Sequence, residues 1–177
     1  MKMATRIGIG MLVLFVAMVL PSQVQASAGK VLSCTKMVHV AAKKTDTSLP
    51  CLDGGAGATF QSLRGPIVVN VWGSWCAPCI EEIPHFRALA ATKKIAIAGI
   101  DVEEKNMESG RKFVLSHGMT WPILFDPDGR TKGIFGLGVP VTWFIDSAGK
   151  VKYRQIGTIH SDKALFDMVR KYLKVSL

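Results

Sequence analysis

The stretch that decides the fold is IVVNVWGSWCAPCIEEIPHF, residues 67–86. Its first six residues are apolar except for Asn70 and rich in β-branched side chains, a composition typical of a short buried strand. Apolar side chains then recur at helical spacing, which predicts a helix over 77–91. Cys76 and Cys79 therefore fall where a buried strand passes into a helix.

This position gives the cysteine pair its chemistry. At a helix N-terminus, unpaired backbone N–H groups and the positive end of the dipole favour a thiolate over a thiol. The thiolate attacks a disulfide and forms a mixed disulfide. A second cysteine, separated from the first by two residues, can then attack the mixed disulfide and release the partner. We therefore predict that Cys76 is the nucleophile and Cys79 the resolving thiol. Half of a four-cysteine zinc site is the alternative, but Cys34 and Cys51 are too widely spaced to supply the second half.

Strands and helices alternate beyond this stretch. A second buried strand is expected over 94–102, and an amphipathic helix over 108–117 that Gly118 ends. Strand, helix, strand, helix in this order implies βαβ units.

The C-terminal part has a different order of elements, in which two strands precede a helix. Two strands, 141–145 and 151–156, are joined by a short turn and predict an antiparallel hairpin. Ser161 can cap a last helix that runs to about residue 175. The complete order predicts an α/β fold with a mixed central sheet flanked by helices.

The first 26 residues have the layout of a secretory signal peptide. Lys2 and Arg6 precede an uncharged apolar run, 7–20, and a small residue, Ala26, follows. The run is shorter than the ~20 residues that span a bilayer as a helix, so we expect cleavage after Ala26, with a retained membrane anchor as the alternative. Both alternatives place the folded part outside the cytosol: it would be secreted after cleavage, or anchored to the outer face of the cytoplasmic membrane.

The net charge of +9 favours acidic partners or an anionic membrane surface. The basic residues are dispersed, apart from pairs such as 43–44 and 93–94, and they form no cluster with interleaved aromatic residues. We therefore do not expect a nucleic-acid partner. No nucleotide site is readable, and the scattered histidines have no metal-ligand spacing, so neither a cofactor nor a metal is predicted.

Two motifs carry a resemblance to a known family. Asn70 to Cys79, followed by Glu82 and Pro84, and the segment GVPVTWFID at 138–146 are similar to the extracytoplasmic thioredoxin-like proteins of the TlpA and ResA type. The resemblance covers roughly 54–173, including a central αβ insertion. It divides the chain into 1–26 as signal or anchor, 27–53 as an N-terminal extended arm and 54–177 as the thioredoxin-like domain.

The resemblance also implies site residues. In thioredoxin-like folds the loop proline facing the cysteines is cis, and Pro140 occupies that position. A cis proline exposes the backbone of the preceding residue, here Val139, to an extended substrate segment. A trans proline that merely starts a strand is the alternative. The predicted substrate-binding residues are Trp75, Pro78, Val139 and Pro140.

A proton acceptor is also expected near the cysteines. Thioredoxin carries a buried Asp on the strand before its motif, but Asn70 at that position cannot accept a proton. Glu82 lies three residues beyond Cys79, on the same helical face, and the resemblance places the family's active-site Glu there. The alternative is an ordinary acid complementing the helix dipole.

Cys34 and Cys51 form the other cysteine pair of an exported chain. The simplest interpretation is a structural disulfide that stabilises the N-terminal arm. A second redox relay with Cys76 is the alternative, disfavoured because neither cysteine is expected to start a helix.

Together these residues predict an enzyme, a thiol-disulfide oxidoreductase acting on protein substrates that carry cysteines or disulfides. The resemblance suggests the reducing direction, for example on the haem-site cysteines of apocytochrome c, with electrons from a membrane partner. The alternatives are a DsbA-like oxidant, a thiol peroxidase and a non-catalytic binding module.

Overall fold

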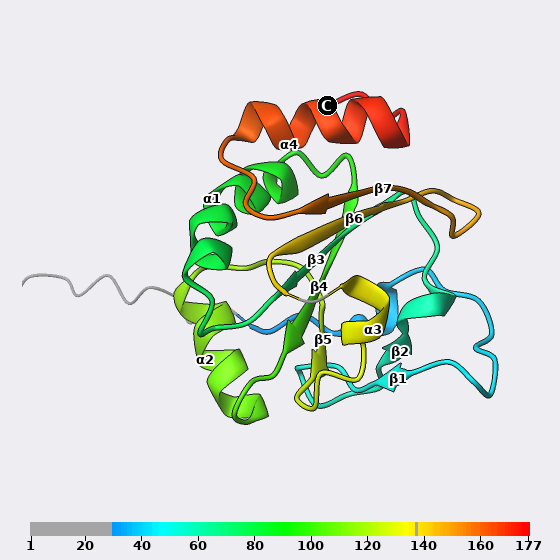
Figure 1. The fold of residues 1–177 in the computed structure, drawn as a ribbon, viewed down its shortest axis with the longest axis vertical. Helices are drawn as coiled ribbons and strands as arrows, with labels where there is room; N and C mark the ends of the chain where they lie inside the picture. Colours follow the sequence, from blue (N-terminus) through cyan, green and yellow to red (C-terminus); the bar gives the residue numbers. More distant parts are fainter. Residues whose placement is uncertain (1–29, 137) are drawn as a thin grey trace, which may run out of the picture.

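The computed structural model describes residues 30–136 and 138–177, so the signal or anchor expected over 1–26 lies outside the described residues. Its centre is a five-stranded sheet in the order β5-β4-β3-β6-β7 (Figure 1). Four strands run in the same direction, and β6 alone is reversed and pairs antiparallel with both β3 and β7, which confirms the predicted mixed sheet. The strands are β3 (Ile67–Trp72), β4 (Ala96–Val102), β5 (Ile123–Asp126), β6 (Val141–Ile145) and β7 (Val151–Ile156).

Helices cover one face of the sheet. Phe86, Val114 and Leu165, one from each of three helices, belong to a single apolar cluster on that face. Figure 1 shows the longest helix beside the C-terminal one. The helices are α1 (Ala77–Ala91), α2 (Met107–Ser116) and α4 (Asp162–Met168), the last continuing as a π-helical turn, Val169–Leu173.

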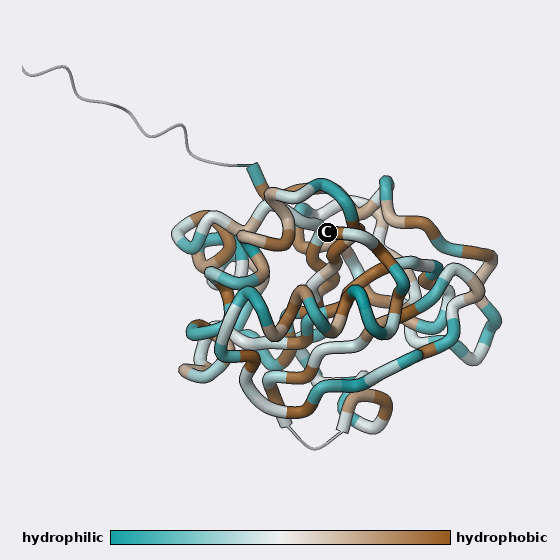
Figure 2. Tube along the Cα trace, turned by 90° about the horizontal axis from the view of Figure 1, so that it is seen from above, coloured by the Kyte–Doolittle hydropathy of each residue, from teal (hydrophilic) through white to brown (hydrophobic). Residues whose placement is uncertain are grey.

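The other face is covered by the segment before β3 and by α3 (Lys132–Phe135). Leu49, Phe60 and Phe135 belong to a second apolar cluster there. Every residue of β3 is buried, because this strand lies at the centre of the sheet between the two clusters. Figure 2 shows hydrophobic stretches in the interior and hydrophilic ones mainly in the outer loops.

The segment predicted as an extended arm contains little regular structure. Two short strands, β1 (Ser48–Leu49) and β2 (Ala58–Thr59), pair with each other, and Cys51 forms an isolated bridge with Leu124 of β5. Leu52 is fully buried. Residues on both sides of position 53 therefore pack on the same core.

Element ends follow the local signals. The helix α2 ends where Gly118 adopts φ +61°, a left-handed conformation that favours glycine, and Met119 N–H donates to the Val114 carbonyl at 3.0 Å. Ser161 caps α4 by accepting a hydrogen bond from Ala164 N–H, as predicted. Within residues 30–136 and 138–177, no helix is long and apolar enough to cross a membrane.

Candidate active site

Cys76 and Cys79 are joined by a disulfide, with their Cα atoms 5.3 Å apart. Cys76 is the residue that caps α1, because its backbone is extended while Ala77 already begins the helix. Its Sγ atom accepts a hydrogen bond from Cys79 N–H at 3.2 Å. After reduction the same N–H and the helix dipole would stabilise a thiolate at Cys76.

Glu82 is fully buried in the first turns of α1, where the sequence placed an acid on the Cys79 face. One carboxylate oxygen accepts a hydrogen bond from Ile159 N–H at 2.7 Å, and the other accepts from the Asn70 amide at 3.5 Å. Burial raises the pKa of Glu82 to about 7, although both hydrogen bonds act to lower it. A carboxyl group with this pKa gains and loses a proton near neutral pH, which suits a proton acceptor for a thiol.

The peptide bond between Val139 and Pro140 is cis. Val141 pairs with Val71 in the antiparallel register of β3 and β6, so Pro140 lies beside the C-terminal end of β3, from which the chain continues to Cys76. Pro140 is buried and Val139 is half-buried. Two hollows, of about 260 and 180 Å³, share Val139 in their lining.

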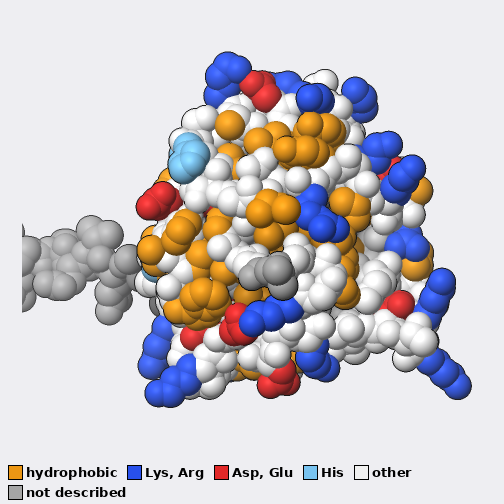
Figure 3. Space-filling view, viewed as in Figure 1, with side chains coloured by type: hydrophobic (Ala, Val, Ile, Leu, Met, Phe, Trp, Pro, Cys, Tyr) orange, Lys and Arg blue, Asp and Glu red, His pale blue; other side chains and the backbone are white. Residues whose placement is uncertain are grey.

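Trp75 is 55% exposed immediately before the disulfide. Its indole N–H donates to the Val102 carbonyl at 3.3 Å, which fixes the ring beside the end of β4, and the ring lines the larger hollow opposite Val139. Pro78 is also exposed. Figure 3 shows hydrophobic side chains in the left-hand, central and upper parts of the face that it draws, while most basic side chains lie around the edge. The four predicted substrate-binding residues thus all lie close to the cysteines along the chain or across the sheet.

Two buried acids near this site were not found from the sequence. Glu104 is 7% exposed, and its carboxylate accepts a hydrogen bond from Ser74 N–H at 3.3 Å, just before the cysteine motif. Asp101, the next-to-last residue of β4, has no exposure, and neither carboxyl oxygen has a hydrogen-bond partner in the described part of the chain. An acid within an otherwise apolar strand was the available signal.

The surroundings of Asp101 favour its protonated form. Burial, with a smaller contribution from the charge of Glu104, raises the pKa of Asp101 to about 8. The α2 backbone packs against it, because a Cβ atom added at Gly110 would lie 2.2 Å from Asp101 Oδ2. Only glycine at that position allows the helix to approach so closely.

The second cysteine pair is also bonded. Cys34 and Cys51 are joined with their Cα atoms 5.8 Å apart, and both belong to the apolar cluster on the sheet face opposite Cys76 and Cys79. One expectation was wrong, since Cys34 does start a helical turn, the 3-10 turn Cys34–Lys36. The cap of Ser33 and the following turn form this local structure, which is too short for a substantial helix dipole.

The chain matches the model of the AhpC/TSA family over residues 40–154. It is 31% identical to the thiol-disulfide oxidoreductase ResA of Bacillus thuringiensis over 108 residues, which are 58% of this chain and 62% of ResA. The match therefore spans less than two thirds of that relative. It is 32% identical to the thiol:disulfide interchange protein DsbE of Pseudomonas fluorescens over 127 residues, 71% of each protein.

A solved structure is also similar. MTB DsbF superposes with a TM-score of 0.63 at 26% identity, over 72% of this chain and 95% of that one. Its fold therefore agrees with the thioredoxin-like fold that the sequence predicted. The chain belongs to the AhpC/TSA family, among the thiol-disulfide oxidoreductases of the ResA and DsbE type.

Proposed function

We propose that this protein is an extracytoplasmic thiol-disulfide oxidoreductase that reduces disulfides in protein substrates. The observation that carries the proposal is the bonded Cys76–Cys79 pair at the N-terminus of α1, where Cys76 Sγ accepts the Cys79 N–H. The fully buried Glu82 on the same helix supplies an acid–base group with a pKa of about 7.

The reaction begins with the reduced pair. The Cys76 thiolate attacks one sulfur of a substrate disulfide, forming a mixed disulfide and releasing one substrate thiolate, which takes up a proton. The Cys79 thiol gives its proton to Glu82, and the resulting thiolate attacks Cys76 Sγ. The mixed disulfide breaks, Cys76 and Cys79 become oxidised, and the second substrate thiolate leaves. Glu82 returns its proton to solvent or to this leaving thiolate.

The substrate segment would lie along Val139. Its backbone could pair with Val139 while neighbouring apolar side chains enter the two hollows that flank this residue. The exposed Trp75 ring, held by its bond to the Val102 carbonyl, would form one wall of the larger hollow. Pro78 would stiffen the loop that presents the two sulfur atoms.

The chain's relatives and its composition support the proposed direction and cellular setting. Reduction of haem-site cysteines in apocytochrome c fits a member of the ResA and DsbE type. Each turnover leaves the protein oxidised, so two electrons and two protons must come from a donor, for which we propose a membrane thiol protein. Two disulfides and the signal layout of 1–26 support a location outside the cytosol.

A trapping experiment tests these roles. Cys79→Ala leaves Cys76 able to attack but removes the resolving thiol, so a mixed disulfide with a cysteine-containing substrate should accumulate. Mass spectrometry after incubation of the reduced variant with insulin should locate the adduct on Cys76. Failure to form an adduct, or an adduct on Cys34 or Cys51, would contradict the proposal.

A further inference from the structure

A groove of about 610 Å³ lies at the end of the molecule opposite the Cys76–Cys79 disulfide. Ile67 at the start of β3 and Ala90 near the end of α1 both line it. At about 3.3 Å per strand residue and 1.5 Å per helix residue, β3 and α1 each place roughly 20 Å between the groove and Cys76. The groove is therefore separate from the site described above.

Basic side chains lie in this groove and beside it. Lys30 and Lys36 line it, and Lys93 and Lys94 fall in the sequence between two lining residues, Ala90 and Ile95. All four are exposed, none takes part in an ion pair within the described residues, and the described lining contains no Asp or Glu. Arg64 adds a fifth charge, with its guanidinium donating to backbone carbonyls nearby. The unbalanced positive charge favours an anionic partner.

Aliphatic side chains lie among these charges. Leu32 and Val38 line the groove and are 40% and 64% exposed. Exposed aliphatic groups beside lysines are typical of surfaces that rest on an anionic membrane, because the apolar groups enter the interface while the lysines meet lipid phosphates.

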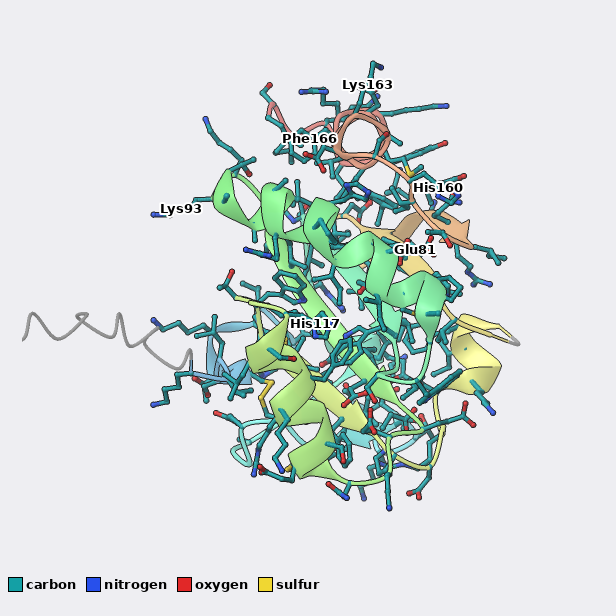
Figure 4. The ribbon with its side chains drawn as sticks, turned by 90° about the vertical axis from the view of Figure 1, so that its left-hand side faces the viewer. Glu81, Lys93, His117, His160, Lys163 and Phe166 are labelled. Atoms are coloured by element: carbon teal, nitrogen blue, oxygen red, sulfur yellow. A yellow bond between two sulfur atoms is a disulfide. The ribbon has the colours of Figure 1, made fainter. Side chains whose placement is uncertain are left out.

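The path of the chain points to the same end of the molecule. Lys30 is the first described residue and lines the groove, and the apolar run 7–20 ends only about ten positions earlier. Ten extended residues reach at most ~35 Å. Figure 4 shows the start of the described chain, drawn in blue, on the same side as Lys93, whereas Glu81, near the start of α1, lies toward the other side.

We propose that this end of the molecule binds the surface of an anionic phospholipid bilayer. The binding surface comprises the groove, lined by Lys30, Lys36, Leu32 and Val38, and the adjoining Lys93 and Lys94. The catalytic disulfide then faces away from the membrane, toward soluble protein substrates. This inference goes beyond thiol-disulfide exchange and does not depend on it.

The full chain is tested on vesicles of phosphatidylcholine alone and of phosphatidylcholine with phosphatidylglycerol, by co-sedimentation. The run 7–20 would contribute to binding on both vesicle types, and the flanking Lys2 and Arg6 are unchanged in every variant. The change between variants in the extra binding caused by phosphatidylglycerol therefore reports the groove and its neighbouring lysines. Lys93→Glu with Lys94→Glu should reduce that gain roughly tenfold or more. Lys105→Glu with Lys112→Glu, two exposed lysines near the catalytic end, changes the net charge equally and should reduce the gain far less.

A second pair of variants addresses the apolar rim. Leu32→Asn with Val38→Asn keeps the charge and should weaken binding to the anionic vesicles severalfold. Equal losses from the two charge-reversed pairs would show a general charge effect and overturn the proposal. Loss of self-association in the Lys93 and Lys94 variant, with vesicle binding unchanged, would also overturn it, because a second copy of the chain would then occupy the groove.

Discussion

The two disulfides of this protein have similar burial and different surroundings. Cys76 and Cys79 are 4% and 2% exposed, and Cys34 and Cys51 are 2% and 0% exposed. The first pair begins a helix of 15 residues, whereas Cys34 begins a turn of three. The fully buried Glu82 follows Cys79 on the same helix.

Burial alone therefore does not separate the pair that we propose as redox-active from the pair that we propose as structural. A long helix supplies a dipole and aligned N–H groups at its start, and a buried acid supplies a proton acceptor. Cys51 lies in a loop segment beside Leu124 at the edge of the sheet. A disulfide in such a place stabilises the folded protein mainly by restricting the conformations of the unfolded chain. The following predictions separate the chemistry of one pair from the stability provided by the other.

The largest effect is expected from Cys76→Ser. A serine hydroxyl does not ionise near neutral pH and cannot form the mixed disulfide, so insulin reduction should fall by at least about 10³-fold. The rate of insulin precipitation in the presence of dithiothreitol measures this loss. Substantial remaining activity would mean that another thiol attacks the substrate.

Asp101→Asn should act on stability through pH. Because the folded-state pKa is about 8, above the value in the unfolded chain, the native state keeps a proton that the unfolded chain loses above about pH 4. The associated stability is complete below about pH 4 and declines as the pH rises to about 8. The variant should therefore exceed the native protein in unfolding free energy at pH 8, by on the order of 5 kcal/mol, and differ little near pH 4.

Urea unfolding at both pH values measures this difference. The exposed Asp128→Asn variant serves as a control and should show no comparable dependence on pH. If Asp101→Asn changed the stability equally at both pH values, the buried carboxyl group would not be protonated as inferred.

Removing the other disulfide should affect stability rather than chemistry. Cys34→Ala with Cys51→Ala opens a loop with a sequence separation of 17, and the unfolding free energy should fall by about 3 kcal/mol. Insulin reduction at 25 °C should stay within about twofold of the native rate. Loss of activity in a variant that remains folded would favour the relay over the structural role.

The smallest effect is expected from Glu82→Gln. In the proposed mechanism Glu82 accepts the Cys79 proton, so removal of its carboxyl group should lower the rate by roughly 100-fold at pH 7. A step in the rate near pH 7 should also disappear, since the pKa of Glu82 is about 7. Insulin reduction measured from pH 5.5 to 8.5 tests both points. Glu81→Gln alters an exposed neighbour and should keep both the rate and the step.

The sequence predicted the elements next to the cysteines with accurate bounds. The strand Ile67–Trp72 and the helix Ala77–Ala91 match the expectation because strong local signals, an apolar run and a helical period, coincide with the motif. The hairpin of β6 and β7 was predicted because a short turn joins two strand-like segments. The last helix ends at Leu173 in a π-helical turn, which side-chain spacing does not reveal.

Long-range packing was less predictable. The bridge of Cys51 to β5 and the place of β5 at the sheet edge depend on segments far apart in sequence. The burial of Asp101 depends on the close approach of α2 at Gly110. Local composition does not specify such contacts, so the acid within the apolar strand could be noticed in the sequence, but the burial of Asp101 and Glu104 was established only by the structure.

The most direct test is a redox titration that reports both pairs in one protein. The native chain is equilibrated with glutathione or dithiothreitol buffers, free thiols are alkylated, and mass spectrometry determines the oxidised fraction of each pair. The account predicts about −270 mV for Cys76 and Cys79, and a value below about −300 mV for Cys34 and Cys51. A potential near −120 mV for Cys76 and Cys79 would indicate an oxidant of secreted proteins. Easier reduction of Cys34 and Cys51 than of the motif pair would contradict the assignment of the active site.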